Sequence, residues 1–338
     1  MTVFLVLLVI GLFSARPAIA AQGVVFQTSV APHADEDLAS ECRYEMTLTD
    51  PSRTVRGIWV IFDRGRDMLR YYGDPDVQAF AQHHDLALLL PFHCGAKSYS
   101  APGAKGDMNV DPTKGIGRAL LAAITQLAQS SSHPELASAK LILLGFSGAG
   151  SLVGRLADYA PDRIVAVIPA DAGHFEPLGL DTISLSPKAS AIPQLILTGG
   201  ADSVCGTQRP YGYFRKHFDQ GAPWTFVVQN KTPHCCIINA KSLILLWLEA
   251  ILKETQTPPA VAARINRGNG WFGFIRTEEN ETKDLWGGTN WSVSTATTER
   301  RPTPPRGMIP AGWLPSHRFA KQWVSFVRQP EHPITSLP

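Results

Sequence analysis

Residues 140–150 read Lys-Leu-Ile-Leu-Leu-Gly-Phe-Ser-Gly-Ala-Gly, and this stretch decides the fold of the chain. An apolar run is followed by a turn of small residues around Ser147, and a helical pattern continues over 151–157. A serine at the tip of a sharp strand-to-helix turn has a strained backbone that tolerates only small neighbours. The pattern therefore predicts a nucleophile elbow. The alternative is a glycine-rich turn that only allows close packing, and Ala149 stands where the motif has its second glycine.

Short apolar runs alternate with helical patterns on both sides of this elbow. Buried strands are predicted over 57–62, 86–90, 140–144, 164–168, 195–198 and 224–228, a half-exposed strand over 41–47, and amphipathic or apolar helices over 114–129 and 242–252. Such alternation is typical of a parallel sheet that helices cover on both faces. Ligands of these sheets bind at the carboxyl ends of the strands.

Two later strand ends carry the partners that a serine nucleophile needs. Asp202 follows the strand at 195–198 behind two glycines, and His234 follows the strand at 224–228. A serine requires a base, and the base requires a carboxylate that orients it. The order of the three residues along the chain predicts a triad of Ser147, Asp202 and His234.

A competing acid and a competing base lie in one loop. Asp171 follows the strand at 164–168, and His174 lies three residues further on. Either of them could replace its counterpart in the predicted triad.

Residues 40–254 resemble the α/β-hydrolase superfamily, through the elbow at Ser147, the Gly-Gly-Ala-Asp segment that ends at Asp202 and the late His234. The motifs identify no subfamily. The resemblance implies a mostly parallel eight-stranded sheet whose first strands can be antiparallel. It also implies ester hydrolysis through an acyl-enzyme, with no metal and no organic cofactor.

The resemblance assigns an oxyanion hole to two backbone segments. One donor is expected to be the amide of Gly148, directly after the serine. The other is expected in the loop Asp63-Arg64-Gly65-Arg66-Asp67, as the amide of Arg64 or Gly65, where many family members carry His-Gly. The alternative for Arg64 is a surface charge paired with Asp63 or Asp67.

The first residues are typical of a secretory signal peptide. An apolar run over 3–13 precedes Ala-Ile-Ala at 18–20, which predicts cleavage after residue 20; the alternative is an uncleaved anchor. We therefore expect a secreted or periplasmic protein without stable membrane insertion, whose residues 21–39 are irregular. A net charge of +2 gives no reason to expect nucleic acid as a partner.

Export would allow disulfides among the five cysteines. If the acid and base loops meet, Cys205 is expected to bond to Cys235 or Cys236; the alternative is three buried thiols. Cys42 and Cys94 could form a second bridge. No Cys-x-x-Cys pair suggests zinc.

Residues 255–338 form an extension outside the resemblance, rich in proline and tryptophan. Trp271, Trp286, Trp291, Trp313 and Trp323 lie in it. They are expected to pack the extension against the core; the alternatives are a lid or a surface for carbohydrate. Asn230, Asn280 and Asn290 begin glycosylation sequons. His93 and Tyr99 could line the pocket.

The function expected from these patterns is a secreted serine hydrolase of carboxylic esters, acting on a small molecule or on a polymer. A serine peptidase of the same fold is a second hypothesis, although the sequence contains no obvious large propeller or cap domain. The third hypothesis is a non-catalytic binding protein on a hydrolase scaffold.

Overall fold

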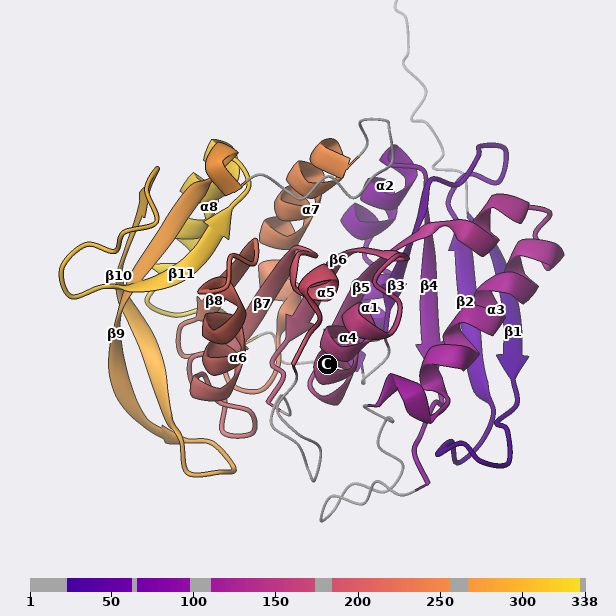
Figure 1. The fold of residues 1–338 in the computed structure, drawn as a ribbon, viewed down its shortest axis with the longest axis horizontal. Coiled ribbons are helices and arrows are strands. Elements are labelled where there is room, and N and C mark those ends of the chain that lie inside the picture. The colour runs from indigo at the N-terminus through magenta and orange to yellow at the C-terminus, as the bar shows by residue number, and fades with distance from the viewer. Residues whose placement is uncertain (1–22, 63–65, 98–110, 174–183, 256–266, 335–338) are drawn as a thin grey trace, which may run out of the picture.

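One mixed β-sheet organises the chain in the computed structural model, which describes residues 23–62, 66–97, 111–173, 184–255 and 267–334. Within these residues the sheet has eleven strands, in the order β1-β2-β4-β3-β5-β6-β7-β8-β11-β9-β10. Figure 1 shows it running from β1 on the right to the long β9 and β10 on the left. The predicted signal peptide at 1–20 lies outside the described residues.

The first eight strands form the sheet that the resemblance implies. They are β1 (Val24–Val30), β2 (Cys42–Leu48), β3 (Gly57–Ile61), β4 (Leu86–Phe92), β5 (Lys140–Phe146), β6 (Ile164–Ala170), β7 (Gln194–Gly199) and β8 (Trp224–Gln229). β1 and β2 are antiparallel to their neighbours, whereas β4, β3, β5, β6, β7 and β8 pair in parallel. The predicted mostly parallel sheet with an antiparallel start is confirmed.

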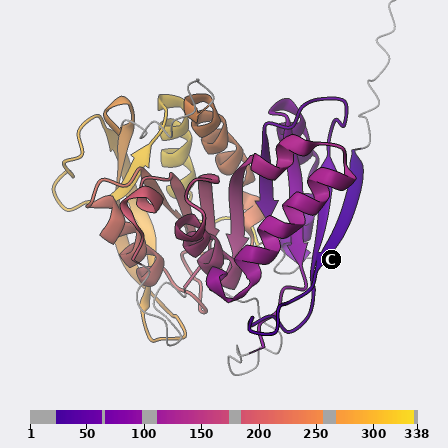
Figure 2. The same ribbon diagram turned by 45° about the vertical axis from the view of Figure 1, so that its right-hand side comes forward.

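Helices cover both faces of the sheet. They are α1 (Arg66–Tyr72), α2 (Pro75–His83), α3 (Ile116–Ser130), α4 (Gly148–Tyr159), α5 (Pro187–Ser190), α6 (Gln208–Phe218), α7 (Lys241–Thr255) and α8 (His317–Val327). The strand β3 shows the division, because successive side chains of a strand point to opposite faces. Ile58 and Val60 pack in one core with α3 and α4, and Trp59 and Ile61 pack in another with α1, α2 and α7. Figure 2 shows α3 in front of the first strands.

None of the helices in the described ranges is long and apolar enough to cross a bilayer.

The C-terminal extension lengthens the same sheet. β9 (Trp271–Lys283) pairs in antiparallel fashion with β10 (Thr289–Glu299) on one side and with β11 (Ile309–Leu314) on the other, and β11 pairs with β8 at Gly312 and Thr225. A Cβ on Gly312 would collide with the Trp224 carbonyl, so the close pairing requires glycine there. Trp313 and Trp323 are buried in the core, as expected for packing, while Trp286 is exposed. The added strands were not predicted; they cover the edge that β8 would otherwise expose.

The expectation that residues 21–39 are irregular is wrong for their first part. Val24–Val30 form β1, which pairs with β2 over its whole length. Most of β1 is exposed or half-buried, so its residues carry little of the apolar pattern by which strands are recognised. The open edge of β2 supplies the hydrogen bonds instead.

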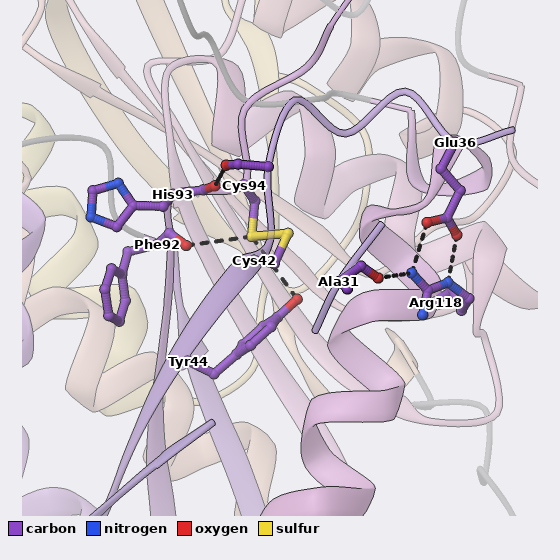
Figure 3. Close-up of a disulfide and its surroundings, with 9 residues drawn as sticks. Ala31, Glu36, Cys42, Tyr44, Phe92, His93, Cys94 and Arg118 are labelled. Atoms are coloured by element: carbon purple, nitrogen blue, oxygen red, sulfur yellow. Dashed lines mark hydrogen bonds and ion pairs between the residues drawn. A yellow bond between two sulfur atoms is a disulfide. The ribbon is translucent and has the colours of Figure 1, made fainter. Parts of the chain in front are cut away.

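A disulfide ties this antiparallel end of the sheet together (Figure 3). Cys42, at the start of β2, is bonded to Cys94, two residues after β4, across a separation of 52 residues. The possible bridge between these two cysteines is therefore present. A crosslink that closes a loop of this length lowers the conformational entropy of the unfolded chain. In the chain-entropy account this stabilises the folded protein by about 4 kcal/mol.

A second tie joins the segment after β1 to α3. Arg118 donates from Nε to Glu36 Oε1 at 2.5 Å, and from Nη2 both to Glu36 Oε2 at 2.7 Å and to the Ala31 carbonyl at 3.0 Å (Figure 3). The Glu36 side chain is only 10% exposed. The hydrogen bonds from Arg118 lower the pKa of Glu36 from 4.5 to about 2.

This lowered pKa predicts a pH-dependent contribution to stability. Because Glu36 binds its proton less tightly in the folded chain, the contribution is present above pH 4.5 and is lost as the pH falls toward 2. The melting temperature of Glu36→Gln should lie below that of the unmodified protein at pH 7, and the gap should narrow toward pH 2.5. Glu331→Gln is the control, since its ion pair with Lys231 is exposed. A gap for Glu36→Gln that stays constant between pH 7 and 2.5 would contradict the assignment.

Candidate active site

Ser147 lies at the turn between β5 and α4 in a backbone conformation that is rare for a serine. Its φ is 57° and its ψ is −123°. A Cβ on Gly145 would collide with the Ala149 carbonyl, and one on Gly150 would lie 2.8 Å from Cβ of Ala172. Ala149, where the motif has its second glycine, lies in the first turn of α4 and is buried in the core on that face of the sheet. The turn therefore has the geometry of the predicted nucleophile elbow.

The structure brings the three residues of the predicted triad together. His234 Nε2 lies 3.0 Å from Ser147 Oγ, and His234 Nδ1 lies 2.8 Å from Asp202 Oδ2. The residues follow β5, β7 and β8, whose parallel pairing places their carboxyl ends on one edge of the sheet. The Phe146 ring packs against the His234 ring with centroids 4.8 Å apart. These contacts fix the imidazole between the hydroxyl and the carboxylate.

Asp202 is fully buried and is surrounded by hydrogen-bond donors. Its Oδ1 accepts from the amides of Val204 at 2.7 Å and Cys205 at 2.8 Å, which leaves Oδ2 for His234. Donors of this kind stabilise a carboxylate away from water. The carbonyl of the same residue accepts from the side-chain amide of Asn290 at 2.8 Å. Sequence reasoning treated Asn290 only as the start of a sequon and did not place it here.

Backbone hydrogen bonds join the loop that carries Asp202 to the loop that carries His234. The Ala201 amide donates to the Thr232 carbonyl at 2.9 Å, and the Gly200 amide donates to the Gln229 carbonyl at 2.8 Å. A Cβ on Gly199 would lie only 2.5 Å from the Thr232 carbonyl. The two loops are therefore in direct contact, as the order of the motifs requires.

The predicted disulfide between these loops is wrong. Cys235 and Cys236 are bonded to each other, and Cys205 is in neither disulfide of the described residues. This bond joins neighbours in the chain, a pairing that the prediction did not consider. The Cys236 amide donates to Asp67 Oδ2 at 3.3 Å, so α1 also binds the segment that follows His234.

Asp171, the competing acid, lies close to Asp202 but does not bond to the histidine. It is buried, and its Oδ1 accepts from the Gly199 amide at 2.7 Å. Burial, reinforced by the charge of Asp202, raises the pKa of Asp171 well above its usual range. The two acids therefore differ in their contacts, and only Asp202 binds His234. The competing base His174 lies outside the described residues.

Of the residues predicted to supply oxyanion donors, only Gly148 lies within the described residues. Gly148 is the first residue of α4, where amides have no acceptor within the helix and attract negative charge. Arg64 and Gly65 lie outside the described residues, and so does Tyr99. His93 is exposed, and its ring contacts Phe92.

One group in the described part of the chain has the composition of a metal site. Ligand atoms of Asp202, Cys205 and His234 lie within 4.8 Å of one another. Both ring nitrogens of His234 already bind Ser147 and Asp202, so neither is free for a metal. The arrangement fits a hydrogen-bonded relay better than a metal centre.

Comparison with known proteins gives structural neighbours only. No family model and no curated protein matches the chain. An esterase of Pyrobaculum calidifontis is 14% identical over 68% of this chain and 86% of its own, with a TM-score of 0.46. A fluorophosphonate-binding serine hydrolase of Staphylococcus aureus is 14% identical over 68% and 99%, with a TM-score of 0.45. An acylaminoacyl peptidase of Pyrococcus horikoshii is 12% identical over 69% of this chain but 42% of its own, with a TM-score of 0.49.

The strand order, the elbow and the positions of the three side chains are those of one known architecture. The chain has the α/β-hydrolase fold, extended by three strands at its C-terminal end.

Proposed function

We propose that this protein is a secreted serine hydrolase that cleaves carboxylic esters, with Ser147 as nucleophile, His234 as base and Asp202 as orienting acid. The observation that carries the proposal is the unbroken chain of hydrogen bonds from the buried Asp202 through His234 to a serine in a strained turn. A binding protein would need neither the strain nor the aligned donors.

Acylation follows from the two contacts of the imidazole. With Nδ1–H donated to Asp202, Nε2 presents its lone pair to Ser147 and accepts the hydroxyl proton as Oγ attacks the ester carbonyl. The imidazolium then forms beside the Asp202 carboxylate, which stabilises it. The amide of Gly148 donates to the developing oxyanion, and we propose Arg64 or Gly65 as the second donor.

Collapse of the tetrahedral intermediate completes the first half of the reaction. The ester C–O bond breaks, the alcohol oxygen takes the proton from His234 Nε2, and the acyl group stays on Ser147 Oγ. Water then loses a proton to His234 and attacks the acyl-enzyme. The carboxylic acid leaves and the serine recovers its proton.

The substrate is proposed to be a small-molecule or polymer ester outside the cytoplasm. Location rests on the predicted signal peptide at 1–20. A serine peptidase of the same fold is the alternative, and paired ester and amide substrates of the same acyl group separate the two activities.

Hydrolysis of p-nitrophenyl esters from acetyl to long acyl chains is the first test. The mature protein should turn over part of this series, and Ser147→Ala should abolish that turnover, because the variant lacks the oxygen on which the acyl-enzyme is proposed to form. An organophosphonate should label Ser147 in the unmodified protein only. Equal turnover by both proteins would contradict the proposal. A folded protein with neither turnover nor label would be a binding protein.

The two neighbouring acids should respond differently to the same substitution. Asp202→Asn should lower kcat by about 10³- to 10⁴-fold, since the amide favours the wrong imidazole tautomer. Asp171→Asn should leave kcat within about threefold, since His234 binds Asp202 and not Asp171, and an asparagine Oδ1 still accepts from Gly199. The measurement is kcat at pH 7.5 for both variants. A larger loss in Asp171→Asn than in Asp202→Asn would exchange the two roles.

A further inference from the structure

The β9–β10 hairpin of the extension binds the loop that carries Asp202. The Asn290 side-chain amide donates to the Asp202 carbonyl at 2.8 Å, and the Asn280 side-chain amide donates to the Gly200 carbonyl at 2.7 Å. Asn290 is fully buried. The hairpin thus supplies donors to backbone carbonyls on both sides of Ala201.

Backbone contacts strengthen the same attachment. The Trp291 amide donates to Thr207 Oγ1 at 3.1 Å, and the Leu285 amide donates to the Val204 carbonyl at 3.3 Å. A Cβ on Gly206 would lie 2.6 Å from Asp284 Oδ2, so the hairpin also packs tightly there. Residues 200–207, which we call the acid loop, are therefore held along their length by the extension.

The extension also binds the first residue of the loop that carries His234. Asn230, directly after β8, donates its side-chain amide to the carbonyls of Val293 at 3.0 Å and Gln329 at 2.8 Å. Its Oδ1 accepts from the Val293 amide at 2.7 Å. Val293 lies on β10, three residues from Asn290, so the same strand holds both loops.

We propose that Asn290 is a positioning residue for Asp202, and that the C-terminal extension is part of the catalytic unit. The proposal rests on the proposed function, in which Asp202 orients the base. Loss of the Asn290 amide would leave the Asp202 carbonyl buried without this donor and would release the backbone that bears the carboxylate. A displacement of about 1 Å in such a group lowers turnover by up to about 100-fold.

Asn290→Leu is the main test, because leucine keeps the side-chain volume and removes the donor. Thr225→Val is the matched control. Thr225 Oγ1 donates to the Trp313 carbonyl at 2.5 Å, so this variant also deletes one buried hydrogen bond between the extension and the sheet. Thr225 lies near the start of β8, at the opposite end of the strand from the loop of His234.

The readouts are kcat per phosphonate-titrated serine, KM and melting temperature, all in the full-length mature protein. Asn290→Leu should lower kcat by about 10- to 100-fold with KM within about twofold. Thr225→Val should lower the melting temperature and keep kcat. Titration corrects for unfolded molecules, so a purely structural role would not move kcat per site.

Asn280→Ala provides a second route, since Asn280 is only half-buried and its loss is less harmful to folding. It should also lower kcat at constant KM. Unchanged kcat per titrated site in the folded asparagine variants would overturn the proposal. Failure of the proposed function would show earlier, as absence of turnover and label in the unmodified protein.

Discussion

A carboxyl group enclosed in the protein interior is the constraint on which the site depends. Asp202 has no exposed surface, and its oxygens are satisfied by His234 and by the amides of Val204 and Cys205. Nearby Asp171 is the same kind of group without such a set of donors, and burial together with the charge of Asp202 raises its pKa well above the usual range. The donors around each buried carboxyl group therefore decide which of the two acids can orient the base.

The central fold and the three proposed catalytic residues could be predicted from the sequence because their signals are local. Buried parallel strands are apolar runs, an elbow needs small residues around Ser147, and polar residues at strand ends share one sheet edge. The strand β1 carries little apolar pattern, and the pairing of β11 with β8 and the role of Asn290 depend on partners far along the chain. The disulfide between Cys235 and Cys236 is local, but the expectation of a bridge between loops led away from it.

The extension has two roles: it covers an edge of the sheet and it holds two loops of the site. A sheet that ended at β8 would present an unpaired edge beside the loops that carry Asp202 and His234. β11 closes that edge, and the β9–β10 hairpin reaches past it to both loops. The strands that complete the sheet therefore also hold the two loops that carry Asp202 and His234.

The buried carboxamides of Asn230 and Asn290 restrict how this protein can be made. Both begin sequons, and a glycosylating cell attaches oligosaccharide to that side-chain nitrogen. In the folded chain the two nitrogens are enclosed and bound to carbonyls, with no space for a sugar. Oligosaccharide added before folding would therefore block the extension from docking. Production in a host without this modification would keep the extension able to dock.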